Sequence, residues 1–215
     1  NIAIGNYSLD ANTSGDYNVA VGYNSLTANT AASYVTALGG NALKANTTGS
    51  GNTAIGTNAM ESNTTGASNT VMGWNALVTN TTGSNNLAMG VNTMFYNTTG
   101  YKNVALGDYG LWSNTEGMEN VAISGNSSLY KNTTGSQNIA IGAASLYNNE
   151  TGNYNIAIGR SSLYSNTASN NVGIGHESLK SNTTGYRNVA LGYHGLWSNT
   201  EGMENVAISG NSSLY

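Results

Sequence analysis

The chain has 215 residues, of which only 7% are charged, and its formal net charge is −4. Globular domains usually contain roughly 25% charged residues, and proteins that bind nucleic acid gather Lys and Arg into a basic patch. The few charges here are scattered, and no apolar run approaches the ~20 residues of a membrane-spanning helix. We therefore expect neither nucleic-acid binding nor membrane insertion.

One motif repeats along the whole chain at a nearly constant step, with starts at Asn1, Asn18, Val35 and Asn52. Its consensus is N-[IVT]-A-[ILVM]-G-x-x-[SAG]-L-x-x-N-T-T-G-x-x, which is seventeen positions long. The step from Asn120 to Asn138 is longer by one residue, and the step from Asn155 to Asn171 is shorter by one. Self-similarity at a short fixed period is typical of solenoids. We predict a single repeat array over residues 1–215, about 12.5 repeats long, that is a segment of a longer fibre.

The first five positions of each repeat predict a short β-strand, because large and small residues alternate with a period of two. In the repeat that starts at Asn138, one face carries Ile139 and Ile141, and the other carries Asn138, Ala140 and Gly142. The position of Ile141 is apolar in every repeat. We therefore expect Ile141 and its equivalents to face the interior, and the small residues to lie where another backbone packs closely.

A third apolar anchor follows the strand, Leu146 in the same repeat, within a segment that fits either a helical turn or a second short strand. The repeat then closes with N-T-T-G. Asn and Gly tolerate positive φ, and Asn and Thr side chains bond to nearby backbone, so we predict a structural corner. Its Asn and Gly positions include Asn46 and Gly49, Asn63 and Gly66, Asn80 and Gly83, and Asn182 and Gly185.

A single repeat is too small to fold alone. Three buried aliphatic side chains contribute ~1.5–3 kcal/mol each, whereas ordering the backbone costs ~1–2 kcal/mol per residue. Stacked repeats recover the difference through hydrogen bonds between strands, and buried Asn side chains can add ladders in which each amide bonds to the next. We predict an all-β fold, a parallel β-solenoid or β-roll with one repeat per coil and ~4.8 Å between coils.

A longer stretch of sequence also occurs twice, and we call this recurrence the echo. Residues 103–130 recur almost letter for letter at residues 188–215, with Tyr193 in place of Asp108 and His194 in place of Tyr109. Both copies carry an extra glycine just after the strand, Gly125 and Gly210. An extra residue at that point predicts a β-bulge.

These motifs resemble those of known fibre proteins. The N-x-A-I-G-x-x-[SA]-L cadence resembles the repeats in the heads of trimeric autotransporter adhesins. With S-N-T-T-G added, the repeat is more similar to those of bacteriophage tail fibres and bacterial surface proteins, upstream of endosialidase-type chaperone domains. The resemblance covers the whole chain. It implies an extracellular, cell-surface or virion location and self-association as a homotrimer, with a host-surface glycan or receptor as a further partner. Neither end of the array shows a polar cap, and because uncapped strand edges invite association we also expect an end-to-end filament.

Nothing in the sequence predicts catalysis, a cofactor or a metal site. The two histidines, His176 and His194, lie in different repeats without Cys or clustered carboxylates, so we expect them to pack on the surface. Glu116 and Glu119 are paired carboxylates, as in the acid and base of a glycosidase, but they lie on a corner and recur in the second copy of the echo. We interpret them as a solvated edge, and we expect no enzyme.

The residue after the third anchor is polar in most early repeats and becomes aromatic later. This aromatic ladder comprises Phe95, Trp112, Tyr130, Tyr147, Tyr164 and, after an interruption, Trp197. We favour a structural role at chain contacts for Trp112, Tyr130, Tyr147 and Tyr164, but exposed rings could also stack on sugars. We therefore expect a structural or adhesive fibre segment. The alternative is a glycan- or ice-binding solenoid that uses the aromatic ladder or the column of Thr13, Thr30, Thr47 and Thr64.

Overall fold

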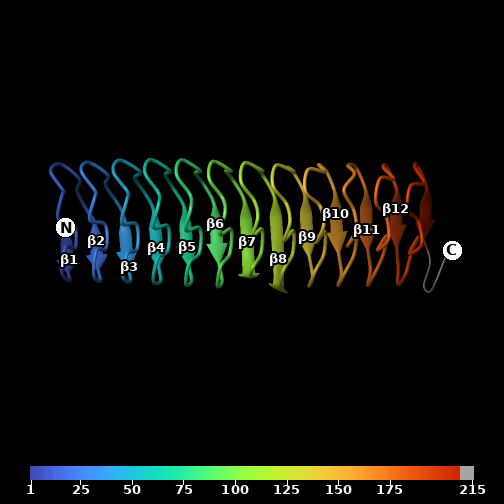
Figure 1. Cartoon of the computed structure of the whole chain (residues 1–215), viewed down its shortest axis with the longest axis horizontal. Helices are drawn as coiled ribbons and strands as arrows, with labels where there is room; N and C mark the ends of the chain where they lie inside the picture. The colour runs from blue at the N-terminus through green and yellow to red at the C-terminus, as the bar shows by residue number, and fades with distance from the viewer. Residues whose placement is uncertain (209–215) are drawn as a thin grey trace.

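The computed structural model describes residues 1–208 and confirms the predicted β-solenoid (Figure 1). Thirteen strands form one parallel sheet in which each strand pairs only with its neighbours in chain order. The chain returns after every strand through a wide turn, so the coils stack along one axis as a rod. The second predicted bulge, at Gly210, lies outside the described residues.

The strands are short, and all but two have three residues. They are β1 Ile2–Ile4, β2 Val19–Val21, β3 Thr36–Leu38, β4 Thr53–Ile55, β5 Thr70–Met72, β6 Leu87–Met89, β7 Val104–Asp108, β8 Val121–Asn126, β9 Ile139–Ile141, β10 Ile156–Ile158, β11 Val172–Ile174, β12 Val189–Leu191 and β13 Val206–Ile208. Within residues 1–208, no helix has the length and apolar character that crossing a membrane requires.

The irregular repeats keep the strands in register. Between β7 and β8, Leu106 pairs with Ile123 but Asp108 pairs with Asn126, which confirms the bulge predicted beside Gly125. The repeat that is one residue short loses that residue in its corner, where Asn166 Nδ2 donates to the carbonyl of Ala168 rather than to a residue three positions on. Strands β10 and β11 therefore remain paired at equivalent residues.

The face of each strand that is buried is the opposite of the one that the sequence predicted. In β9, Ala140 is fully buried whereas Ile141 is 37% exposed, and the second residue of every strand from β2 to β13 is buried. The turns run close behind the sheet, so space there is short. At Gly173, which replaces Ala in β11, a Cβ atom would lie 2.7 Å from Ser162 Oγ and 3.2 Å from Leu163 Cγ. Small residues therefore fill the interior face, and the inward assignment of Ile141 is wrong.

The third anchor supplies the one large aliphatic side chain that each coil buries regularly. Leu146 is fully buried and lies in the left-handed region at φ 48°, as do its equivalents, so this segment is neither helix nor strand. A residue with a side chain usually loses ~1–2 kcal/mol in this conformation. Here the amide of Leu146 donates to the carbonyl of Ser162 in the next coil at 3.0 Å, and this pairing holds the conformation.

The corner asparagines form a buried ladder. Asn63 Nδ2 donates to Asn46 Oδ1 at 2.8 Å and to the carbonyl of Gly66 at 3.0 Å, and Asn80 continues the ladder to Asn63 at 2.7 Å. The asparagines that precede the strands form a second ladder. For example, the backbone amide of Asn69 donates to Asn52 Oδ1, one coil earlier, at 2.9 Å. Both columns of buried asparagines are therefore paired coil by coil.

Candidate functional site

The outward side of the sheet is a continuous apolar strip, which we call the aliphatic face. Two residues per strand contribute to it, on either side of the buried second residue. Its members are Ile2, Ile4, Val19, Val21, Thr36, Leu38, Thr53, Ile55, Thr70, Met72, Leu87, Met89, Val104, Leu106, Val121, Ile123, Ile139, Ile141, Ile156, Ile158, Val172, Ile174, Val189, Leu191, Val206 and Ile208. Sequence reasoning identified the strand aliphatics but placed them inside the rod.

No charged residue lies on the aliphatic face, and only three Thr interrupt its apolar side chains. Leu38 and Met72 are each 45% exposed, so these chains reach solvent rather than another layer of the fold. Thirteen strands spaced ~4.8 Å apart, each ~10 Å long, give the face an area on the order of 600 Å². The largest apolar patch on a monomeric protein typically measures about 300–600 Å² and is often functional.

The rings of the aromatic ladder contact one another. The ring centroids of Trp112 and Tyr130 are 5.0 Å apart, and those of Tyr130, Tyr147 and Tyr164 follow at 5.1 Å, with interplanar angles of 5–11° in the tyrosine pairs. All four are half-buried. The inner rings therefore have both faces covered by their neighbours, and they present mainly their edges to solvent.

The two ends of the ladder differ from its middle. Phe95 is tilted by 32° against Trp112, with centroids 6.2 Å apart, and Tyr96 packs edge-on against both rings. Trp197 does not continue the stack, because Lys180 occupies the intervening coil. Burial raises the pKa of the Tyr130 hydroxyl, and the neighbouring Tyr147 raises it further.

The hydroxyl groups of the threonine column donate hydrogen bonds within the rod. Thr13 Oγ1 donates to the carbonyl of Thr30 at 2.9 Å, and Thr47 Oγ1 donates to the carbonyl of Thr64 at 3.0 Å. The hydroxyl protons therefore hold successive corners together. The column lies in the corner, as the sequence predicted, and not on the sheet.

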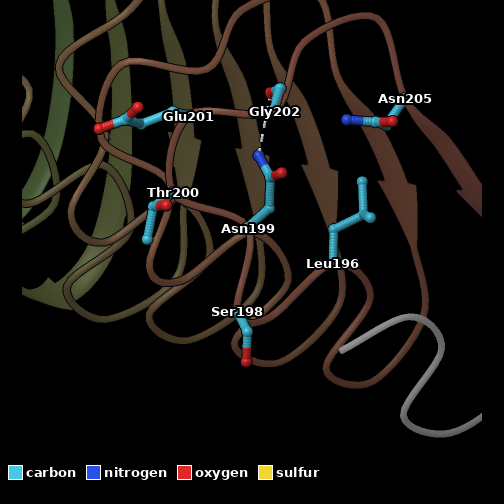
Figure 2. Close-up of a pocket in the computed structure, with 7 residues that line it drawn as sticks. All are labelled: Leu196, Ser198, Asn199, Thr200, Glu201, Gly202 and Asn205. Carbon is cyan, nitrogen blue, oxygen red and sulfur yellow. Dashed lines mark hydrogen bonds between the residues drawn. The ribbon is translucent and has the colours of Figure 1, made fainter.

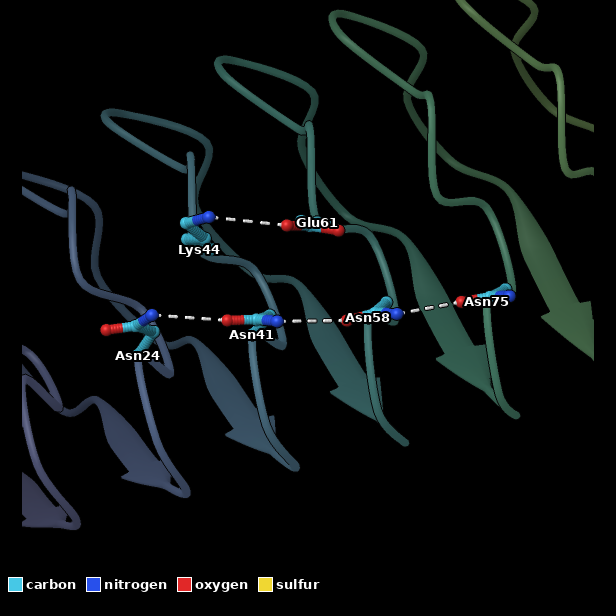
Figure 3. Close-up of polar contacts among 6 residues, drawn as sticks. All are labelled: Asn24, Asn41, Lys44, Asn58, Glu61 and Asn75. Carbon is cyan, nitrogen blue, oxygen red and sulfur yellow. Dashed lines mark hydrogen bonds and ion pairs between the residues drawn. The ribbon is translucent and has the colours of Figure 1, made fainter.

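A third polar ladder, which we call the outer Asn ladder, lies in the turn after the strand. It consists of Asn24, Asn41, Asn58, Asn75 and Asn92, and the Nδ2 of each of the first four donates to the Oδ1 of the next at 3.0–3.4 Å. Figure 3 shows the ladder from Asn24 to Asn75. Beside it, Lys44 and Glu61 form an exposed ion pair across the coils at 3.4 Å. Sequence reasoning gave no role to this position.

The same position holds a different set of side chains near the end of the described rod. His176, Glu177 and His194 each offer a metal-ligating atom, and these atoms lie within 4.8 Å of one another. The sequence prediction kept the two histidines apart because they belong to different repeats. Glu177 and His194 are separated by one full repeat, so the periodicity itself carried the signal.

Hollows border the part of the rod that residues 1–208 form, and two of them are described next. The first is lined by Leu196, Ser198, Asn199, Thr200, Glu201, Gly202 and Asn205, and the corner hydrogen bond from Asn199 to Gly202 crosses it at 3.1 Å (Figure 2). The equivalent corner residues Asn182 and Gly185 are buried under the next coil, so this hollow is the end surface of the last described coil. The second is a depression where Tyr147 and Tyr164 lie beside Arg160.

Comparison with known proteins finds no family model that matches the chain, and no curated protein or solved structure that does. The surfaces described above are therefore the basis for inferring a function.

Proposed function

We propose that this chain is a structural segment of an extracellular or virion-surface fibre, and that its rods assemble through the aliphatic face. One observation carries the proposal: an uncharged apolar strip runs along the outside of all thirteen strands. Removing apolar surface from water is worth about 25 cal/mol per Å². A strip of this size left in water would favour association.

The partner that fits best is a second copy of the same chain. Side chains on the aliphatic face recur at the ~4.8 Å spacing of parallel strands. Only a surface with the same spacing can pack its side chains into the gaps over the whole length of the rod, and a copy of this chain has that spacing by construction. A charged or irregular partner would leave apolar side chains exposed.

We propose a homotrimer, in which three aliphatic faces surround one axis. The similarity of the repeat to those of trimeric fibre proteins supports three chains rather than two. In this trimer the chains contact one another through the aliphatic face and not through Trp112, Tyr130, Tyr147 and Tyr164. The stacked rings already contact one another within one rod.

Light scattering on the purified chain, which gives the mass in solution, tests the proposal. We expect a trimer for the wild type and a folded monomer for the double variant Ile141→Asp, Ile158→Asp, since three chains cannot bury six carboxylates along one axis. Circular dichroism should show the same β-structure for both. A wild-type chain that stays monomeric at high concentration would contradict the proposal.

A second candidate function is carbohydrate binding at the depression beside the aromatic ladder. Its lining combines the ring edges of Tyr147 and Tyr164 with the guanidinium group of Arg160, which can donate several hydrogen bonds to hydroxyl groups. A glycan array probed with the wild type and with Arg160→Gln tests this function. Binding that depends on Arg160 would support an adhesive segment, and an absence of binding would leave the structural role alone.

A further inference from the structure

The geometry of the rod brings His176, Glu177 and His194 together through its backbone. Glu177 and His194 occupy the position of the outer Asn ladder in successive coils, with φ values of 55° and 56°, so their side chains leave the backbone in the same direction. His176 immediately precedes Glu177. Its carbonyl accepts a hydrogen bond from the amide of His194 at 3.1 Å, which fixes the two turns against each other.

The donor atoms of the three side chains form a compact group. His194 Nε2 lies 3.2 Å from Glu177 Oε2, and one ring nitrogen of His176 completes a set whose members are within 4.8 Å of one another. The side chains of Glu177 and His194 are only 20% and 26% exposed. His176 Nδ1 is buried and has no hydrogen-bond partner among the described residues, so this atom lacks the partner that a buried polar group normally has.

Neighbouring side chains fix the position of the Glu177 carboxylate. Lys180 Nζ donates to Glu177 Oε1 at 2.8 Å, and Trp197 Nε1 donates to Oε2 at 3.2 Å. The hydrogen bond from the Lys180 ammonium group lowers the pKa of the Glu177 carboxyl. Tyr193 stacks on both imidazoles, with centroid distances of 5.3 Å to His176 and 3.9 Å to His194.

We propose that His176, Glu177 and His194 bind a first-row transition-metal ion, for which Zn²⁺ is the best match. Two imidazole nitrogens and one carboxylate oxygen are donors that zinc accepts, whereas Ca²⁺ and Mg²⁺ prefer oxygen donors alone. Zinc–donor distances of about 2.0–2.2 Å would require the three side chains to move together by about 1 Å. Glu177 can keep Lys180 on Oε1 while Oε2 meets the ion.

Such an ion would join two adjacent coils and would keep one coordination position for water or an external ligand. Three protein donors leave the fourth position of a tetrahedral zinc ion open. This site is independent of the aliphatic face and goes beyond the proposed fibre role, because all of its donors lie in the turns.

The chain contains an internal control for this site. Five repeats earlier, the places of His176, Glu177 and His194 are taken by Val91, Asn92 and Tyr109. The fold accepts these residues in an otherwise equivalent turn, so the variants His176→Val and His194→Tyr should remove donors without disturbing the rod. The echo of residues 103–130 differs from its second copy at only two positions, and one of them supplies His194.

The test uses the full chain without a histidine tag, stripped of metal with a chelator and titrated with Zn²⁺ in a calorimeter. We expect one ion per chain, and binding at least about tenfold weaker in His176→Val and in His194→Tyr. Lys180→Met should retain zinc binding, because Lys180 contacts Glu177 Oε1 and the ion would be bound by Oε2. Melting curves recorded without zinc should coincide for all chains, which shows that the variants fold.

Two results would overturn the proposal. One is an absence of saturable zinc binding by the wild type, and the other is binding that either histidine variant retains at full affinity. The chain has only two histidines, so a site with two imidazole donors must use both. Loss of binding in both variants, with unchanged melting curves, would therefore place the ion at this cluster, and a loss in only one of them would contradict the three-donor site.

Discussion

Gly39 packs directly against Gly56 in the next coil, so closely that a Cβ atom on Gly39 would lie 2.5 Å from the Gly56 carbonyl oxygen. The backbone of Gly39 also has a φ of +138°, where residues with side chains are strained. The next residue, Gly40, has no heavy atom within 4 Å of its would-be Cβ. Two adjacent glycines in one turn therefore differ completely in what they tolerate.

This difference predicts opposite effects for two alanine substitutions. Gly39→Ala should lower the free energy of unfolding by about 2–5 kcal/mol, because it combines backbone strain with overpacking between coils. Gly40→Ala should change it by less than about 0.5 kcal/mol. Chemical denaturation of both variants measures the difference. Similar values for the two would show that the coils are not in close contact at this position.

A second pair of adjacent residues tests the buried Asn ladder. Asn63→Ala removes the bonds to Asn46 and to Gly66, and leaves Asn80 without its acceptor in the ladder, so we expect a loss of about 2–4 kcal/mol. Thr64→Ala removes one half-buried bond that water can replace, and it should cost less than about 1 kcal/mol. Denaturant midpoints for the two variants check the prediction, and equal losses would argue against a dry ladder.

A third comparison tests which side of the sheet is inside. Leu146→Ala empties a fully buried position and should cost about 2–5 kcal/mol. Ile139→Thr changes an outward position at which Thr already stands in β3, β4 and β5, so it should cost less than about 1 kcal/mol. Thermal melting of the two variants under one set of conditions shows which side of the sheet is inside. A larger loss for Ile139→Thr would restore the inward assignment of the strand aliphatics.

The aromatic ladder predicts a dependence of stability on alkaline pH. The pKa of Tyr130 is raised in the folded rod, so the native state keeps this proton at a pH where the unfolded chain has lost it. The contribution is complete below about pH 10 and is lost as the pH rises through the folded pKa. Unfolding midpoints measured at increasing alkaline pH should therefore fall, and Tyr130→Phe should make the fall less steep. Equal slopes for the two chains would remove Tyr130 as the cause.

The period of the repeat predicted the fold because the strand, the anchor and the corner each return at the same interval along the chain. It could not predict which strand face is buried, because an alternation of two has two faces and the usual rule buries the larger residues. That rule assumes an interior with room for them. Here the turn behind the strand leaves space only for Ala140 and its equivalents, and this spacing exists only after the coil has closed.

The turn conformation was also beyond the sequence. Leu146 and its equivalents adopt positive φ, which sequence rules reserve for Gly and Asn, and only the hydrogen bonds between coils make it favourable. The contact within the histidine cluster could have been predicted more easily. Writing the repeats in register places Glu177 directly before His194 in one column, so the spacing could have predicted their contact once the parallel fold was accepted.

Because every coil pairs only with the coil before it and the coil after it, the length of the rod is a free variable. An in-frame duplication of the DNA that encodes one repeat would insert a complete coil, extend the rod by about 4.8 Å, and leave each hydrogen-bonded ladder continuous. The recurrence of residues 103–130 five repeats later is the pattern that duplication of a five-repeat block would leave. The length of the rod can therefore change in steps of one coil during evolution, without any change in the contacts that hold the fold together.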